Sequence, residues 1–258
     1  MLAHRLYDDG SSRPYVDSDL LVPPQMFEDA ERLLQSRGFV RIANEEGELP
    51  QWAQHGHELM RPGENICVEL HWRLMHYGVA PEDAWQVFNR GAARLRVGRV
   101  EVDVPADPQL ALHAAIHVAE HGAMPTPAED LRRALERFPF ETWAAARELA
   151  QELDADAAFA AGLDMLSTGR VLAQRLGLDA GGVAAFSLER VARASGWRDK
   201  ARVALRIAFP EPVYMRSFDR AWARLGLAGL IAAYVWRPFE LAIRLPGALR
   251  ARAHSRAG

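Results

Sequence analysis

The sequence predicts an α+β protein, in which a mixed sheet with helices comes first and a helical region follows. Strand-like and helix-like segments mix up to about Pro105, and two pairs of strand-like runs enclose tight turns. After that residue the chain reads as helix almost throughout, with clear helix-start signals. We therefore expect an α/β domain at residues 1–105 and a helical domain at residues 106–258.

The first part of the chain alternates apolar runs with turn residues. Pro23-Pro24 begins a helical segment that stops at Gly38. Pro62-Gly63-Glu64-Asn65 is a strong hairpin turn, and Gly98 marks a second hairpin, before an alternating run of valines. In order, the predicted strands are residues 16–22, 39–42, 57–61, 66–72 and the two arms of 94–104.

Proline and capping residues mark the helices of the second part. Asp107-Pro108 combines an N-cap with proline at the first helical position, before a helix that runs to about Gly122. Thr126-Pro127-Ala128-Glu129 is a capping box with the same proline placement. Further helices are predicted at 143–153, 155–176 and roughly 183–194, with breaks at 181–182 and 209–212, and the last eight or so residues are expected to fray.

Composition restricts the class of protein. The chain has 258 residues, 49% of them apolar and 25% charged, which is ordinary for a soluble globular protein. Its net charge of −3 gives no reason to expect bulk binding to nucleic acid, so DNA is not an expected partner. The single cysteine, Cys67, excludes an internal disulfide and fits a reducing cytoplasm. The run from Leu225 to Trp236 is shorter than the roughly 20 residues that span a membrane, so no transmembrane segment is expected.

Two predicted strands carry acidic groups where buried strands normally do not. Because side chains alternate along a strand, Asp17 and Asp19 share one face of the first, and Cys67, Glu69 and His71 share one face of the second. Carboxylates on neighbouring strands repel one another unless cations neutralise them, and oxygen ligands suit Mg²⁺. The pattern indicates metal-assisted phosphoryl or nucleotidyl transfer. The alternative is a polar strand end with three unconnected acids.

The two motifs resemble a broad, mostly uncharacterised bacterial family of nucleotidyltransferases in the DNA polymerase β-like superfamily. The resemblance rests on Arg13, on Asp17-Ser18-Asp19-Leu20-Leu21-Val22 and on Val68-Glu69-Leu70-His71-Trp72, and the Asp130-Leu131 pair also fits the family layout. It implies that residues 1–105 form a nucleotidyltransferase-like domain. It also implies that Asp17, Asp19 and Glu69 are the catalytic residues and metal ligands, holding two Mg²⁺ ions.

The resemblance further implies the substrates. A nucleoside triphosphate such as ATP would be the donor, and a hydroxyl group of a small molecule or peptide would be the acceptor. Ser11, Ser12, Arg13 and His71 are the candidate residues for binding the triphosphate. Two other possibilities stay open: a catalytically degenerate protein that binds a nucleotide or a partner, and a toxin-like enzyme that modifies tRNA or a protein.

Superfamily members usually carry a Gly-Ser step, or in this family a Lys-Gly step, upstream of the acidic pair. Only fifteen residues precede Val16 here, and Leu2 to Tyr7 reads as the end of the helix that follows this step. We expect that the annotated start is late, by about twenty residues as the resemblance implies. The alternative is that part of the triphosphate cradle has been lost.

Three further groups of residues are less specific. His113, His117 and His121 recur every fourth residue, which favours a polar stripe facing a cleft or a neighbouring helix; contact with nucleotide or acceptor and zinc binding are alternatives. His55 and His57 are expected at the surface. The aromatic residues Trp222, Tyr234 and Trp236 alternate with Arg220, Arg224 and Arg237. This favours a packed terminal helix with exposed arginines, with a membrane-surface or nucleic-acid patch as the alternative.

Overall fold

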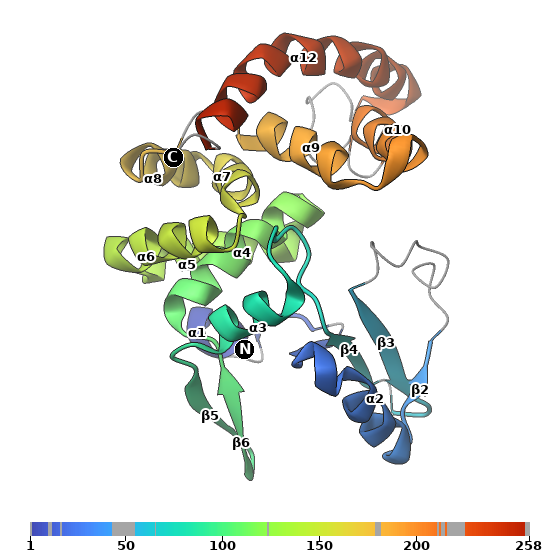
Figure 1. Cartoon of the computed structure of the whole chain (residues 1–258), viewed down its shortest axis with the longest axis vertical. Helices are drawn as coiled ribbons and strands as arrows, with labels where there is room; N and C mark the ends of the chain where they lie inside the picture. Colours follow the sequence, from blue (N-terminus) through green and yellow to red (C-terminus); the bar gives the residue numbers. More distant parts are fainter. Residues whose placement is uncertain are drawn as a thin grey trace. The chain divides into compact units, whose positions relative to one another are not determined.

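The computed structural model describes residues 2–9, 12–15, 17–42, 55–64, 66–122, 124–178, 182–210, 212, 215 and 225–255. The chain divides into two compact units, with the division between Ala106 and Asp107. The described elements of both units are drawn in Figure 1. The first unit is mixed α and β and the second is helical, so the predicted α+β class is confirmed.

A four-stranded mixed sheet forms the centre of the first unit. Its strands are β1 (Ser18–Leu21), β2 (Val40–Arg41), β3 (Gly56–Arg61) and β4 (Ile66–His71), in the order β1-β4-β3-β2. β1 runs parallel to β4, whereas β3 is antiparallel to both β4 and β2. The parallel pair is possible because the chain crosses over from β1 through η2 (Pro24–Met26) and α2 (Phe27–Ser36) before it returns to the sheet.

α2 covers the apolar face of this sheet (Figure 1). Phe27 from α2 packs against Leu59 of β3 and Leu70 of β4, with Trp72 at the border of the cluster. Leu59 and Leu70 are 0% and 1% exposed, so this face of β3 and β4 is buried in the core. Because side chains alternate along a strand, the intervening residues must project from the opposite face. That face carries the candidate site.

The remaining elements of the first unit are short. They are α1 (Leu2–Leu6), α3 (Pro81–Asn89) and a separate hairpin formed by β5 (Ala93–Val97) and β6 (Val100–Val104). Both predicted hairpins are thereby confirmed, the first at β3–β4 and the second at β5–β6, where Gly98 adopts a φ of +61° in the turn. α3 was not predicted, although Pro81 followed by two acidic residues is a helix-start signal.

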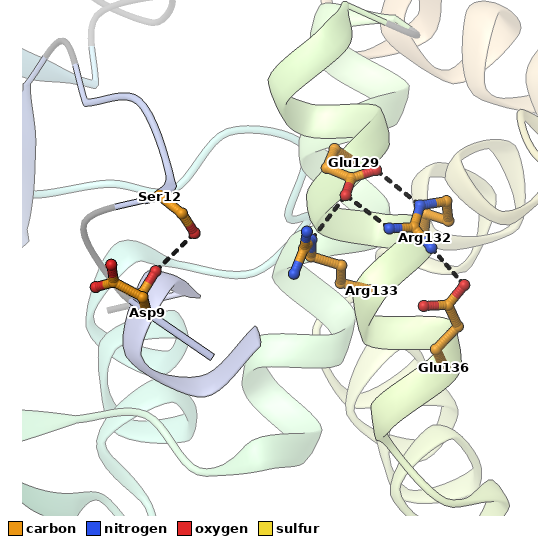
Figure 2. Close-up of polar contacts among 6 residues, drawn as sticks. All are labelled: Asp9, Ser12, Glu129, Arg132, Arg133 and Glu136. Atoms are coloured by element: carbon orange, nitrogen blue, oxygen red, sulfur yellow. Dashed lines mark hydrogen bonds and ion pairs between the residues drawn. The ribbon is translucent and has the colours of Figure 1, made fainter. Parts of the chain in front are cut away.

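The second unit consists of packed helices. In chain order they are α4 (Asp107–His121), α5 (Pro125–Arg137), α6 (Phe140–Glu152), α7 (Asp156–Asp164), α8 (Ser167–Arg175), α9 (Gly182–Arg193), α10 (Gly196–Ala208) and α12 (Gly226–Ser255). α4 and α7 are central: most of their residues are buried, and Phe159 and Leu163 of α7 are 0% exposed. On the surface of α5, Arg132 bridges Glu129 and Glu136 (Figure 2). These charge-assisted hydrogen bonds lower the pKa of Glu129 to about 2.

Three boundary predictions are wrong. Residues 155–176 form two helices, because Leu166 adopts an extended backbone and starts a new helix. The capping box at Thr126 does not form: α5 begins earlier, at Pro125, with Met124 as an N-cap that makes no side-chain hydrogen bond. Fraying was expected from about residue 251, but α12 continues to Ser255, and residues 256–258 lie outside the described residues. α10 was not predicted at all.

α12 is long enough to bear on the question of a membrane span. Its segment Gly226–Ile243 has a mean hydropathy of 1.2, and 11% of the segment is buried. By length and composition alone, this segment could cross a membrane. The helix continues past the apolar run that the sequence suggested, through Pro238 and Pro246. The expectation that the chain has no transmembrane segment therefore stays a prediction.

The crossing of α7 over α4 yields a test of the helical core. A Cβ added at Gly162 would lie 1.8 Å from the carbonyl oxygen of Ala115, so the two backbones approach too closely for any side chain. Alanine normally stabilises a helix relative to glycine by roughly 0.5–1 kcal/mol. We predict the opposite sign for Gly162→Ala, a loss of about 1–3 kcal/mol in the free energy of unfolding, measured by urea denaturation. Unchanged or increased stability would show that the helices do not meet at this glycine.

Candidate functional site

Three carboxylates lie in one row across neighbouring strands. The register of β1 with β4 pairs Asp19 with Glu69, and the register of β4 with β3 pairs Glu69 with Glu58. Residues paired in register project from the same face of a sheet. All three therefore lie on the face opposite the apolar cluster under α2. Asp19 is the most exposed of the predicted acids, with 66% of its side chain accessible, against 28% for Glu69.

Asp17 joins this row from the residue before β1. It is half-buried, and its pKa is raised first by burial and then by the charges of Asp19, Glu69 and Glu58. The coupling to all three acids places four carboxylates within electrostatic reach of one another. Such a group is destabilised when fully ionised, and a bound cation or a proton relieves the repulsion. Clustered carboxylate oxygens of this kind are the ligands that Mg²⁺ and Ca²⁺ prefer.

Two imidazole rings border the carboxylates. His71 shares a face with Glu69 on β4, and its Nε2 lies 3.2 Å from Asp19 Oδ1 and 3.7 Å from Glu69 Oε1. His55, which directly precedes β3, has its Nε2 3.4 Å from Glu69 Oε1, and its ring stacks on His71 with the centroids 5.3 Å apart. Ligand atoms of His55, Glu69 and His71 all lie within 4.8 Å of one another. The rings therefore orient the carboxylates and add nitrogen ligands beside the oxygens.

Gly56 makes room for this ring packing. It lies opposite His71 in the β3–β4 register. A Cβ at this position would lie 3.0 Å from His71 Nδ1 and 2.6 Å from the carbonyl oxygen of Leu70. Both contacts are too short to form without displacing the ring or the strand. Glycine at this first residue of β3 allows the close approach of the His71 side chain and of the neighbouring strand.

Cys67 contacts the same acidic group but remains a thiol. Its Sγ donates to Glu58 Oε1 at 3.2 Å. Burial raises the pKa of Cys67 to about 12, and the hydrogen bond to Glu58 and the neighbouring negative charges act in the same direction. Without a bound metal, a thiol with this pKa stays protonated at neutral pH and is not a nucleophile. Cys67 therefore contributes a hydrogen bond that orients Glu58.

The structure places the predicted phosphate-binding residues only in part. The Ser12 hydroxyl donates to the carbonyl oxygen of Asp9 at 2.6 Å, a contact shown in Figure 2, so it caps a local turn. The guanidinium of Arg13 lies over the ring of Tyr15, 5.3 Å from its centroid. Ser11 lies outside the described residues. Of the predicted site residues, the structure thus brings together Asp17, Asp19, Glu69 and His71.

The other histidines that the sequence singled out do not lie beside the carboxylates. His57, expected at the surface, is 15% exposed and pairs with Glu31 at 3.0 Å on the α2 side of the sheet. His113, His117 and His121 follow one another along α4, with ring centroids 5.5 and 4.5 Å apart. Among the described residues, His55, Glu69 and His71 have ligand atoms that all lie within 4.8 Å of one another, and the α4 histidines form no such group. Zinc binding by the α4 histidines is not supported.

Sequence reasoning missed Glu58 and His55. Both could have been found from the hairpin turn, because a four-residue turn that pairs Arg61 with Ile66 also pairs Glu58 with Glu69. His55 was assigned to the surface by default, whereas its side chain is 16% exposed and packs beside Glu69. The missing step was to count the register from the turn toward the site.

Comparison with known proteins agrees with this geometry. A family model described as "Uncharacterised nucleotidyltransferase" matches residues 1–168, which cover the whole sheet and the first helices of the second unit. No curated protein and no solved structure matches the chain.

The raised pKa of Asp17 gives a pH-dependent test without metal. Because the folded-state pKa lies above the unfolded value of 3.8, Asp17 favours folding below that value, and the benefit is lost as pH rises through the folded pKa. Asp17→Asn should therefore stabilise the protein more at pH 7 than at pH 4, as measured by urea denaturation in EDTA. The matched control is Asp83→Asn, an exposed acid in the first turn of α3, which should be neutral or slightly destabilising at pH 7. A D17N gain that does not grow with pH would refute the proposed carboxylate repulsion.

Proposed function

We propose that the protein is a Mg²⁺-dependent nucleotidyltransferase. The chain belongs to the family of uncharacterised nucleotidyltransferases whose model matches residues 1–168, and the proposal proceeds from that membership. Its donor would be a nucleoside triphosphate, and its acceptor would be a hydroxyl group of a small molecule or peptide. The observation that supports this most directly is the clustering of Asp17, Asp19, Glu58 and Glu69 on the face of the sheet opposite α2. Metal-assisted transfer at a phosphate requires such a cluster of oxygen ligands.

Asp17, Asp19 and Glu69 are the residues that would hold the metal. Two Mg²⁺ ions, when bound, supply charge neutralisation for the triphosphate and lower the pKa of the acceptor hydroxyl. The chain's own contribution is to hold these carboxylates at fixed positions: β1 and β4 set Asp19 and Glu69 in register. Burial raises the pKa of Asp17 most, and the charges of Asp19, Glu69 and Glu58 raise it further. That repulsion would favour cation binding.

Glu69 is best placed to accept the proton of the acceptor hydroxyl. It lies at the centre of the row, between Asp19 and Glu58, and both imidazole rings approach its Oε1. If Nε2 of His71 carries a proton, it donates to Asp19 and fixes that carboxylate. A general base of this kind acts best when its position is fixed before substrate binds.

Arg13 is the residue proposed to contact the triphosphate. It lies four positions before Asp17, and its guanidinium rests on the ring of Tyr15. A planar guanidinium binds phosphate oxygens through charge-assisted hydrogen bonds. The net negative charge of the carboxylate row makes a nearby cation necessary for a triphosphate to approach. Arg13 and the bound metal would share this role.

Activity should depend on all three acids. We predict that Asp17→Asn, Asp19→Asn and Glu69→Gln each lower nucleotidyl transfer by about 100-fold or more, since metal and proton-transfer contributions amount to several kcal/mol. The assay incubates the protein with Mg²⁺ and each labelled nucleoside triphosphate, ATP included, in host lysate and follows which molecule gains label. The control is Glu64→Gln in the exposed β3–β4 turn, which should keep full activity.

The outcome of that assay also separates the remaining possibilities. Label on a small molecule or peptide supports the proposal, and label on tRNA or a large protein would favour a toxin-like enzyme instead. Near-normal transfer by D17N or D19N would show that this pair is not the metal site. Absence of labelling together with triphosphate binding would identify a degenerate nucleotide-binding protein.

Arg13 should affect the triphosphate rather than the fold. Loss of one hydrogen bond to a charged group costs about 1.5–3 kcal/mol, so Arg13→Ala should raise the KM for triphosphate by roughly 10- to 150-fold. The unfolding midpoint in urea should not change. The control is Arg99→Ala, an exposed arginine in the turn between β5 and β6. Unchanged triphosphate affinity in R13A would mean that another residue holds the phosphates.

A further inference from the structure

α12 exposes a continuous apolar ridge. Five large apolar residues follow one another at every fourth position, and each is more than half exposed: Leu227 72%, Ile231 54%, Val235 62%, Phe239 61% and Ile243 72%. Residues spaced by four form a ridge along the surface of a helix. Soluble monomers rarely expose contiguous apolar patches of this kind unless they bind something.

The opposite face of α12 is already packed on its own unit. Leu230 and Ala233 are buried together with Met215, and Tyr234 packs against this cluster. The Tyr234 hydroxyl donates to the carbonyl oxygen of Pro210, and Arg237 Nε donates to that of Ile207. These two hydrogen bonds join α12 to the C-terminal end of α10. In Figure 1, α12 arches over α9 and α10.

α10 adds exposed aromatic and basic side chains beside this helix. Trp197 is 75% exposed and Phe209, just after the helix, is 53% exposed. The exposed basic residues of α10 are Arg198, Lys200, Arg202 and Arg206. Tryptophan and long basic side chains have an apolar body and a polar end, so they suit a boundary between an apolar phase and water.

The charge of the chain is strongly asymmetric. Residues 182–258 contain fourteen arginines and lysines but only five acidic residues, whereas the whole chain has a net charge of −3. The excess of acidic residues therefore lies in residues 1–181. A basic region with an exposed apolar ridge is complementary to an anionic bilayer surface, which offers negative headgroups above an apolar interior.

We propose that the ridge on α12 docks the protein onto the surface of a membrane rich in anionic lipids. The helix lies on the bilayer and does not cross it. One of its faces is committed to the protein core, and the apolar segment Gly226–Ile243 contains Arg237 and Glu240. Pro238 and Pro246 lie inside the helix, and prolines at such positions favour a bent helix, which suits an interface. The exposed basic side chains of α10 would pair with the lipid phosphates.

Vesicle flotation of the full-length protein tests this proposal. The vesicles are phosphatidylcholine alone, or equal parts of phosphatidylcholine and phosphatidylglycerol, at low and high salt. We expect flotation with the anionic vesicles at low salt, weaker flotation at high salt because charge attraction is screened, and none with phosphatidylcholine alone. Ile231→Asn combined with Val235→Asn should lower anionic binding at least tenfold.

The control is Val171→Asn on α8, where an equally exposed apolar side chain lies away from the ridge, at 59% exposure. It should float like the wild type, and urea denaturation should show all variants equally folded. No flotation with anionic vesicles at low salt, or equal flotation of the double variant, would overturn the proposal. So would a lipid-free dimer, measured by light scattering, that the double variant converts to monomers, because the ridge would then be covered by a second copy of the chain.

Discussion

Repulsion among carboxylates is the constraint on which the architecture of the first unit depends. The register of three strands brings Asp19, Glu69 and Glu58 into one row, and Asp17 joins them with a raised pKa. Such a row can persist only because the opposite face of the same strands is packed under α2, which fixes the register. Apolar burial on one face of the sheet thus holds a cluster of charges together on the other face, and a cation would stabilise that cluster.

The residues around the row of carboxylates also help to hold it in place. Gly56 leaves space for the His71 ring, and the stacked rings of His55 and His71 hold the central carboxylate. Cys67 hydrogen-bonds to Glu58 as an un-ionised thiol, so it adds no further negative charge. Each of these residues depends on strand pairing for its place. A one-residue slip of β4 would transfer Glu69 to the apolar face.

Sequence patterns predicted the sheet elements, both hairpins and the shared face of Glu69 and His71, because these depend on local turn residues and on alternation. Glu58 and His55 escaped notice, since their importance arises only from the pairing of β3 with β4. The break between α7 and α8 was missed because apolar periodicity continues across the extended Leu166, and the close approach at Gly162 is a tertiary contact with no local signal. The ridge on α12 was equally hidden, because the apolar pattern alone does not show which face is packed.

The central claim is that the clustered carboxylates form a divalent-cation site for nucleotidyl transfer. Electron paramagnetic resonance with Mn²⁺, used as a spectroscopic substitute for Mg²⁺, counts bound ions directly. In the presence of a non-hydrolysable nucleoside triphosphate, the wild-type protein should bind Mn²⁺ beyond the amount held by the nucleotide alone, and Mg²⁺ should compete for it. Asp19→Asn should lose this protein-dependent binding while remaining folded. Equal Mn²⁺ binding by D19N and the wild type would contradict the account.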